Sequence, residues 1–451
     1  MPAGTYPRSN HANRPKTVAT LLALGVVMPF NLAVVLASLC ASAVAKKPRA
    51  IASRRPRTVL ISGGKMTKAL QLARSIHAAG HRTILVDTRK YWLTGHRFSR
   101  AVDRFYTIPE PRDPGYAEAL LEIVRSEGVE IYVPVCSPVA SVFDSRAIPL
   151  LRPTCEVIHL DPEIIGQVDD KFRFAELSAS LGLPAPKSFL ITDPRDVETF
   201  DFSHERRRFI LKSIAYDSVR RLDLTLLPRP TPKETSAFVR SLPISPDNPW
   251  VLQEFIAGRE YCTHGTVRDG TLVVHCCCES SPFQINYQQV DKPEITRWVK
   301  RFAAGLGLTG QVSLDFIEAD DDGQTYAIEC NPRTHSAITM LHDRPDLAAA
   351  YLGEPTLHNP VQPGPQSRPT YFLYHEVWRL IMSLASASGV RARLRTIRAG
   401  RDAVFDWRDP LPFLMLHHWH MPLLLLADLK QGRGWHRIDF NIGKLVQPGG
   451  D

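Results

Sequence analysis

The stretch YAIECNPRTHSAITM, residues 326–340, places three polar side chains at alternate positions directly after an apolar run. Residues 326–328 have the composition of the end of a buried strand. Glu329, Asn331 and Arg333 follow at every second position, so in an extended chain all three would lie on one face. A carboxylate beside an amide oxygen suits a hard cation such as Mg²⁺, and an arginine on that side suits a phosphate oxygen. A strand end that turns into solvent explains the same residues equally well.

The composition narrows the class of protein. The chain has 451 residues, which predicts two or three domains. Its net charge of +9 is spread along the whole length, which indicates anionic ligands or an anionic membrane face rather than a nucleic-acid-binding arm. The eight cysteines show no paired spacing, and three of them are consecutive, at 276–278, within an expected buried strand. We therefore expect reduced thiols and neither a disulfide framework nor a zinc site.

Residues 58–87 predict a βαβ unit and hence a parallel sheet. A strand at 58–62 leads through Gly63 and Gly64 into a helix at 66–79, and a second strand follows at 83–87. The two glycines could present backbone N–H groups to an anion at the start of the helix, although a plain turn explains them as well.

A second helix and strand, at 116–127 and 131–135, extend this sheet. Ligands of such sheets bind beyond the carboxyl ends of the strands, which makes Ser137 and Ser141 candidate substrate contacts. The loop KYWLTGHRFSR, residues 90–100, mixes aromatic and basic side chains, as either a substrate loop or an ordinary solvated loop does.

After residue 160 the pattern changes to a mixture of helices and antiparallel strands. We expect a helix at 170–181 that Gly182 ends, and later a hairpin that turns at 268–270. The other expected elements are a strand at 206–214, two strands with a short connection between them at 250–267, a helix at 292–306, and two strands joined by an acidic turn between 310 and 331.

Charged and polar residues recur along this second part in an order that suits a nucleoside triphosphate. The set consists of Lys171, Lys212, Gln253, Glu254, Ile256, Glu260, Asp315, Glu329, Asn331 and Arg333. Two lysines neutralise phosphates, a strand connection offers backbone groups to a base, and one glutamate accepts both ribose hydroxyls. Two carboxylates and an amide hold magnesium. Each residue alone is explained by a solvated strand end, but the ordered set is not.

This order resembles the ATP-grasp superfamily over residues 58–345, and Glu-x-Asn-Pro-Arg at 329–333 is the most specific part. The resemblance implies an N-terminal parallel α/β domain followed by an α+β ATP-grasp domain. It implies that Lys171, Lys212, Gln253, Glu254, Ile256 and Glu260 bind ATP, and that Asp315, Glu329 and Asn331 bind Mg²⁺, with Mn²⁺ as an alternative. Arg333 and Lys212 would stabilise the transferring phosphoryl group. The usual glycine-rich loop is replaced by SIAYDSVRR, in which Arg220 and Arg221 could hold phosphate or substrate.

The chain further resembles the ATP-grasp ligases of mycosporine biosynthesis over nearly its whole length. The motifs that carry this likeness include GGKMTKALQLARSIHAAGHR, KYWLTGHRFS, YVPVCSPVAS, LKSIAYDSVRRL, IECNPRTHSAITM and DFNIGKLV. The resemblance implies that glycine is joined to 4-deoxygadusol through a phosphorylated enolate, giving mycosporine-glycine, ADP and phosphate, the product being an ultraviolet-absorbing compound. We expect His335 or His264 to act as the base for the glycine ammonium group, with a structural role as the alternative. Other ATP-grasp carboxylate–amine ligases, such as dipeptide ligases, and a non-catalytic nucleotide-binding regulator remain as alternatives.

The N-terminal segment 17–45 carries no charge and is long enough to span a bilayer. Basic residues flank it on both sides and are denser after it, which favours a cytoplasmic remainder. Pro29 and Asn31 allow a re-entrant hairpin instead, and Ala43-Val44-Ala45 resembles a signal-peptide cleavage site. Because secretion would separate an ATP-using enzyme from ATP, we expect a retained membrane anchor.

We expect four parts in the chain. They are an anchor and basic linker at 1–57, a substrate-binding α/β domain at 58–165, an ATP-grasp domain at 166–350 and a C-terminal extension at 351–451. In the extension we expect a helix at 370–381 and an apolar segment at 412–429 that contains His417, His418 and His420. That segment suits a helix packed on the catalytic domain or one at a membrane surface, and a metal site at its histidines is disfavoured.

Overall fold

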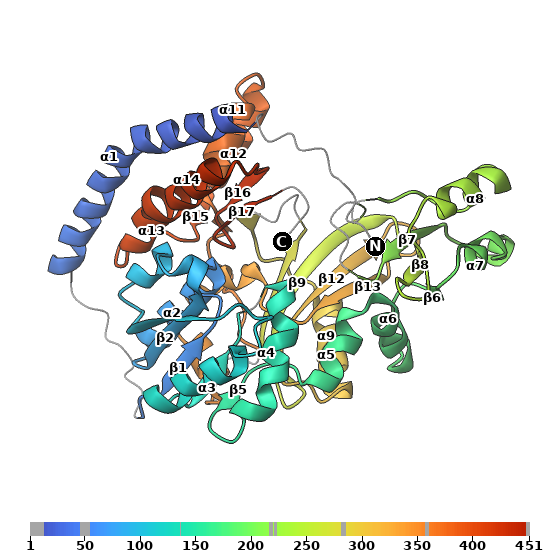
Figure 1. Ribbon diagram of the computed structural model, residues 1–451, viewed down its shortest axis with the longest axis horizontal. Coiled ribbons are helices and arrows are strands. Elements are labelled where there is room, and N and C mark those ends of the chain that lie inside the picture. The colour runs from blue at the N-terminus through green and yellow to red at the C-terminus, as the bar shows by residue number, and fades with distance from the viewer. Residues whose placement is uncertain are drawn as a thin grey trace.

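The computed structural model describes residues 13–45, 55–135, 137–215, 220, 223–280, 286–356 and 360–447 (Figure 1). Two features named above lie outside these residues: the basic linker at 46–54 and most of the loop at 216–222, including Arg221. Arg220 is described.

The N-terminal part contains a parallel five-stranded sheet, as the βαβ pattern predicts. Its strand order is β3 (Arg104–Ile108), β2 (Arg82–Thr88), β1 (Thr58–Ile61), β4 (Ile131–Val133) and β5 (Glu156–Val157). Helices α2 (Thr67–Ala78), α3 (Tyr116–Glu127) and α4 (Pro138–Leu151) connect the strands. The direction of winding reverses between β1 and β4, so the loops that follow these two strands flank the switch point where such sheets bind ligands.

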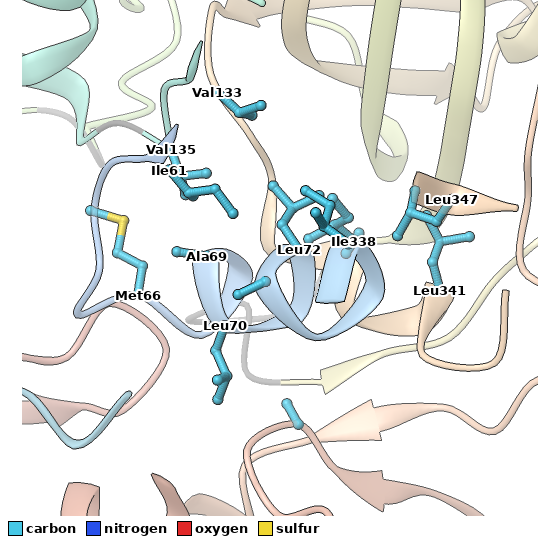
Figure 2. Packing of buried hydrophobic residues seen from close by; sticks show 14 of the residues in the cluster. Ile61, Met66, Ala69, Leu70, Leu72, Val133, Val135, Ile338, Leu341 and Leu347 are labelled. Atoms are coloured by element: carbon cyan, nitrogen blue, oxygen red, sulfur yellow. The ribbon is translucent and has the colours of Figure 1, made fainter. Parts of the chain in front are cut away.

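Helix α2 joins this sheet to the rest of the chain. Figure 2 shows Leu72 of α2 between Ile61 and Val133 of the sheet and Ile338, and all four side chains are fully buried. Ile338 belongs to the 3₁₀ segment η5 (Ser336–Leu341), which is followed by α10 (Leu347–Leu352). Since each fully buried leucine or isoleucine contributes about 1.5–3 kcal/mol, this shared core fixes the end of the 326–340 stretch against the parallel sheet.

The second part has two antiparallel sheets. The larger has the order β10 (Thr271–Glu279), β9 (Gly258–Arg268), β12 (Gly310–Ala319) and β13 (Thr325–Asn331), and the smaller has β6 (Ser188–Ile191), β8 (Trp250–Glu254) and β7 (Phe209–Ser213). Helices α5 (Pro162–Asp169), α6 (Lys171–Ser180) and α9 (Pro293–Gly305) share a buried core with the larger sheet, while α7 (Pro194–Glu198) and α8 (Pro232–Arg240) join the smaller one. The predicted hairpin turn is confirmed, with Asp269 and Gly270 both at positive φ.

The C-terminal part is mostly helical. A short sheet of β11 (Asn286–Tyr287), β14 (Thr370–Tyr371) and β15 (Arg401–Asp402) carries the helices α11 (Leu373–Met382) and α12 (Ala387–Ala399). The predicted helix at 370–381 starts later because residues 370 and 371 pair as β14. Then α13 (Leu411–Met415), a π-helical turn η6 (Leu416–His420) and α14 (Met421–Gln431) form one run before the hairpin β16 (Arg437–Asp439) and β17 (Lys444–Val446).

The three histidines of η6 serve packing. His417 is buried and lies parallel to the ring of Tyr374 at 4.2 Å. Among the described residues no group of three or more His, Cys, Asp or Glu side chains is arranged to hold a metal ion.

Helix α1 (Arg14–Val44) is continuous and contains Pro29, so the alternative of a re-entrant hairpin is wrong. A proline inside a long apolar helix removes one backbone hydrogen bond without breaking the remainder. The helix lies along the outer side of α13, η6 and α14 (Figure 1). In the described part of the chain it is the one helix whose length and apolar composition would allow it to cross a membrane. The division at 57, 165 and 350 stays a prediction.

Candidate active site

A β-bulge in β13 determines which way Glu329 and Asn331 point. Asp315 pairs with Glu329, Phe316 pairs with Ala327, and Ile328 is the additional residue between these pairs. Because of that extra residue, Ala327 and Cys330 can both face the core beneath the sheet, although they are three positions apart. Glu329 and Asn331 then face the opposite side together with Asp315.

The side chains of this face form one polar corner. Asn331 Nδ2 lies 3.0 Å from Glu329 Oε1 and 3.5 Å from Asp315 Oδ2, between the two carboxylates. Arg333 donates to Asn331 Oδ1. Asp315 Oδ1 is buried and has no hydrogen-bond partner. An unpartnered carboxylate oxygen, a second carboxylate and an amide oxygen fit the ligand preference of Mg²⁺, and the amide N–H₂ group occupies the position that a cation bound by both carboxylates would take.

The pKa values of the two carboxyl groups in this corner are shifted in opposite directions. Burial and then the neighbouring Glu329 raise the pKa of Asp315 well above its ordinary value. Burial also disfavours ionisation of Glu329, but Lys171 and Lys212 outweigh it and hold the pKa of Glu329 below its usual range. A divalent cation bound here would offset both the burial of Asp315 and the repulsion between the two carboxylates.

Both predicted lysines reach this corner from different elements. Lys171 is the first residue of α6, where Asp170 caps the helix by accepting from the backbone N–H groups of Phe172 and Arg173. Its Nζ lies 3.4 Å from Glu329 Oε2. Lys212, near the end of β7, donates from Nζ to Gln253 Oε1 at 3.0 Å, and burial lowers the pKa of Lys212. The cap and the buried amide thus fix two cations beside the carboxylates.

The residues expected around adenine and ribose divide into two sets. Ile256 packs in an apolar cluster with Ile317, Ala319, Tyr326 and Ile328 above the corner, and Gln253 is buried beside Lys212. Glu260 is exposed on β9 and is paired across the strands with Ile317.

Glu254 is oriented differently from its expected role. Its carboxylate lies 3.6 Å from the guanidinium of Arg207 and accepts from the backbone N–H of Lys187. Successive residues of a strand point to opposite faces, so when Gln253 faces Lys212 the side chain of Glu254 faces away. Only the backbone of Glu254 is then available for adenine.

The two serines that follow β4, Ser137 and Ser141, both make hydrogen bonds within the protein. Ser141 is buried and donates from Oγ to the carbonyl of Pro332 at 2.7 Å. Ser137 caps α4 by accepting from the backbone N–H of Ala140. Their expected role as substrate contacts is not supported, although the Ser141 bond ties the parallel sheet to the segment between Asn331 and Arg333.

The two histidines proposed as alternative bases, His264 and His335, both accept hydrogen bonds from the backbone. His264 is fully buried, and its Nδ1 accepts from the backbone N–H of His335 at 3.3 Å. His335 caps η5, its own Nδ1 accepting from the backbone N–H of Ala337. The Nδ1 atoms of both histidines are thus engaged by backbone N–H groups.

Lys65, Lys90 and Lys444 form a cluster near the carboxyl ends of β1 and β2. These lysines were not predicted from the sequence. Lys65 pairs with Asp87, its Nζ 3.2 Å from Oδ1, and its Nζ lies 4.1 Å from the centre of the Tyr91 ring. Lys90 lies over the same ring. Burial lowers the pKa of Lys444 to about 8, and Lys65 and Lys90 contribute to this effect. The signal for this cluster was the basic and aromatic character of residues 90–92.

The turn that carries Lys444 is seated directly on the loop after β1. Gly443 has a φ of +65°, in the left-handed region, and a Cβ there would meet the Lys65 carbonyl oxygen at 2.3 Å. The backbone N–H of Thr67 donates to the carbonyl of Asn441 at 2.9 Å. The motifs GGK, KYW and NIGK, far apart in the sequence, therefore meet at one place.

Comparison with solved structures identifies the fold. The chain is similar to N5-carboxyaminoimidazole synthetase from Staphylococcus aureus, with a TM-score of 0.51 and 14% identity over 70% of this chain and 82% of the other. It is similar to phosphoribosylglycinamide synthetase from Anaerococcus prevotii, with a TM-score of 0.51 and 16% identity over 70% and 80%. These likenesses show the expected ATP-grasp fold.

Sequence comparison gives curated relatives of low sequence identity. The chain is 20% identical over 227 residues to the C-terminal section of the large chain of carbamoyl phosphate synthase from Methanopyrus kandleri, and 24% identical over 254 residues to the large chain from Rubrobacter xylanophilus. These matches cover 46% and 51% of this chain but only 40% and 22% of the two relatives. No model of a known protein family matches the chain.

Proposed function

We propose that the chain is an ATP-dependent, ADP-forming ligase that joins glycine to 4-deoxygadusol and gives mycosporine-glycine and phosphate. The observation that carries the proposal is the polar corner, in which Asp315, Glu329 and Asn331 lie between Lys171, Lys212 and Arg333. A non-catalytic nucleotide-binding protein would not require this set to be complete. Nucleotide binding is supported by the fold, because the chain is also similar, with a TM-score of 0.50, to a biotin carboxylase from Campylobacter jejuni whose structure is a complex with β,γ-ATP.

In this proposal the residues of the corner bind and orient the triphosphate. Asp315, Glu329 and Asn331 hold Mg²⁺, with Mn²⁺ as an alternative, and the ion neutralises charge on the β- and γ-phosphates when bound. Lys171 and Lys212 contact phosphate oxygens, and Arg333 faces the phosphoryl group as it is transferred. Arg220, in the loop after β7, would hold phosphate or substrate. The Ile256 cluster contacts the adenine, Gln253 binds its edge, and Glu260 accepts the ribose hydroxyls.

The reaction follows in two steps. The enolate oxygen of 4-deoxygadusol attacks the γ-phosphorus, so a C–O–P linkage forms, the bond between the γ-phosphorus and the bridging oxygen breaks, and ADP leaves. The neutral amine of glycine then adds to the carbon that bears the phosphate, loses a proton, and expels inorganic phosphate. The protein's part is to neutralise charge and align the reactants. Because Nδ1 of His335 is engaged by the backbone N–H of Ala337, we assign the proton from glycine to the departing phosphate.

The lysine cluster is the proposed binding place for the acceptor. An enolised 1,3-diketone is a vinylogous acid and carries a delocalised negative charge near neutral pH. Lys65 and Lys90 offer cations over the ring of Tyr91, and Lys444 lies close enough for both to affect its pKa. This cluster lies at the carboxyl ends of the parallel strands, where such sheets bind ligands. The buried bond between Ser141 and the Pro332 carbonyl brings that sheet to the segment that carries Arg333.

A second candidate is an ATP-grasp ligase that phosphorylates a carboxylate and joins it to an amine. The similarity in fold to phosphoribosylglycinamide synthetase and the distant sequence likeness to carbamoyl phosphate synthase favour it. The two candidates differ in the atom that is phosphorylated, which is the enolate oxygen of the acceptor in the first and a carboxylate oxygen in the second.

An isotope experiment separates the two candidates. The first assay uses 4-deoxygadusol labelled with ¹⁸O at the enolate oxygen that attacks ATP. We expect one labelled oxygen in each inorganic phosphate, measured by mass spectrometry. Label that enters phosphate from ¹⁸O-glycine carboxylate would instead establish carboxylate activation and overturn the enolate mechanism. Glu329→Gln serves as the inactive control and Glu163→Gln, on an exposed turn of α5, as the active one.

We also propose that the catalytic part works in the cytoplasm and that residues 17–45 keep it at a membrane. The length and apolar composition of α1 support this association.

A further inference from the structure

Helix α1 turns its polar side chains toward the protein. Thr17 and Asn31 are buried, and with Leu24 and Val35 they form the buried stripe of the helix. Thr17 Oγ1 accepts from Trp435 Nε1 at 2.9 Å. Asn31 Nδ2 lies 2.6 Å from the hydroxyl of Tyr374 and 2.7 Å from His418 Nε2. Both polar groups of the stripe are thus bound to the C-terminal part of the chain.

The outward face of the same helix is apolar. Val26 is 81% exposed and Phe30 is 68% exposed, each at the middle of the helix. The other exposed large apolar side chains of α1 are Val18, Leu22, Val27, Met28, Leu32, Val34, Leu36 and Val44. A helix on a water-facing surface has the opposite arrangement, and continuous apolar surfaces of this extent mark an interaction site.

The helices α11 and α12 expose further apolar side chains and add positive charge. Tyr374, in the first turn of α11, is hydrogen-bonded to Asn31 of α1. Further along, α11 exposes Trp378 (60%), Ile381 and Met382, and Leu384 (68%) is exposed in the turn that follows. Helix α12 returns with three exposed arginines, Arg391, Arg395 and Arg398. Figure 1 shows this pair of helices next to α1 at one edge of the molecule.

The two helices are fixed relative to each other by a buried carboxylate. Glu376 of α11 is fully buried, and its oxygens lie 2.9 Å from Arg379 Nη1 and 3.5 Å from Arg393 Nη1 of α12. The exposed apolar residues of α11 and the arginines of α12 therefore belong to a formed hairpin, and their exposure is a property of the fold.

We infer that α1 and the α11–α12 hairpin together form a surface that docks in the plane of one leaflet of an anionic bilayer. The apolar face of α1 and the residues around Trp378 enter the acyl boundary, and the arginines of α12 meet lipid phosphates. A transmembrane orientation would strip Thr17 and Asn31 from their partners and leave polar groups in hydrocarbon. The start of the helix is also fixed, because Lys16 Nζ donates to the carbonyl of His436 at 2.7 Å.

This inference refines the proposed membrane association and does not depend on the proposed ligase reaction. It replaces a spanning anchor by a one-leaflet contact, and it adds a second contact region far from α1 in the sequence. The helix and the hairpin would hold the catalytic part at the membrane without a segment on the other side.

Vesicle flotation of the full-length chain tests the surface. We expect binding to phosphatidylcholine vesicles that contain phosphatidylglycerol, and much weaker binding without it. The double variant Trp378→Ser/Leu384→Ser and the triple variant Arg391→Gln/Arg395→Gln/Arg398→Gln should each weaken the apparent Kd at least about tenfold, since each arginine near an anionic surface contributes about 1 kcal/mol. Matched controls are Leu190→Ser, on exposed β6, and Arg104→Gln/Arg112→Gln/Arg125→Gln, on the parallel domain; both should bind as the wild type does.

The outcomes separate the parts of the inference. A wild-type chain that does not bind vesicles overturns membrane association altogether, and a stable dimer under the same conditions would identify a second copy as the occupant of the surface. Variants that bind as tightly as the wild type would overturn the role of the hairpin. All substituted residues are exposed, so circular dichroism should show an unchanged fold.

Depth measurements decide between the two orientations of α1. A bimane label on Ala19→Cys, on Val26→Cys or on the exposed native Cys40 should be quenched by spin-labelled lipids at one common, shallow depth. A depth that passes through the bilayer midplane along the helix would establish a span and overturn the inference.

Discussion

Asp315 and Glu329 lie opposite each other on neighbouring antiparallel strands, and the amide nitrogen of Asn331 lies between their carboxylates. A pair of carboxylates directly across two strands repels and destabilises a sheet. The β-bulge at Ile328 places both on the same face nonetheless, which gives the site its capacity to bind a divalent cation.

Loss of a carboxylate or of the amide in this corner should abolish the reaction. Glu329→Gln and Asn331→Ala each remove a proposed ligand, and we expect ADP release to fall at least about a hundredfold, the effect that loss of a single transition-state contact can have. Full activity of either variant, measured with saturating ATP and Mg²⁺, would contradict the site.

Asp315→Asn should stabilise the metal-free protein while removing activity. The pKa of Asp315 is raised in the folded state, so its protonated form stabilises the fold below the unfolded value of 3.8, and this contribution is lost as the pH rises through the folded pKa. The variant carries no charge at this position and avoids that loss. We expect a gain of about 1 kcal/mol near neutral pH that disappears in acid. Thermal denaturation without metal at several pH values measures it; a gain that is independent of pH would contradict the assignment.

Acceptor binding should weaken as the pH rises through about 8. The pKa of Lys444 is lowered to about 8, so its cation is lost above that value, and with it part of the attraction for an anionic acceptor. The KM for 4-deoxygadusol should rise accordingly while the KM for ATP does not. Lys444→Arg keeps its charge and should preserve the low KM at high pH, whereas Lys444→Gln should show the high KM at every pH. A pH-independent KM in the wild type would argue against the lysine cluster as the acceptor site.

Ser141→Ala separates a structural serine from a substrate contact. The variant loses a buried hydrogen bond to the Pro332 carbonyl, which should cost about 1–3 kcal/mol of unfolding free energy. The KM for the acceptor should stay unchanged. An increased KM with unchanged thermal stability would restore the serine to the substrate site.

Much of the fold could be predicted because local patterns agree with the tertiary structure. The alternation Glu329-x-Asn331-x-Arg333 and the turn at Asp269-Gly270 follow from side-chain direction and backbone preference alone. The long-range convergence of Lys171 and Lys212 on Glu329 was expected from the family resemblance, because no local rule brings a helix start and a strand end together.

Other features depend on contacts that no local pattern encodes. Ser141 donates a hydrogen bond to the carbonyl of Pro332, which is distant in sequence, and Nδ1 of His335 caps η5. The cationic cluster joins Lys65 with Lys444 through a hairpin turn close to the other end of the chain. Pro29 suggested a break in α1, but the surrounding apolar helix and its contacts with α14 outweigh one missing hydrogen bond.

ADP release by the full-length chain with Mg²⁺ and ATP tests the central proposal most directly. The assay compares glycine alone, 4-deoxygadusol alone and the two together, and it follows the near-ultraviolet absorbance of the product. We predict steady turnover with both substrates, slow ADP release with 4-deoxygadusol alone, and none with glycine alone. ADP release that requires an amino-acid carboxylate and is unaffected by 4-deoxygadusol would contradict the proposed reaction.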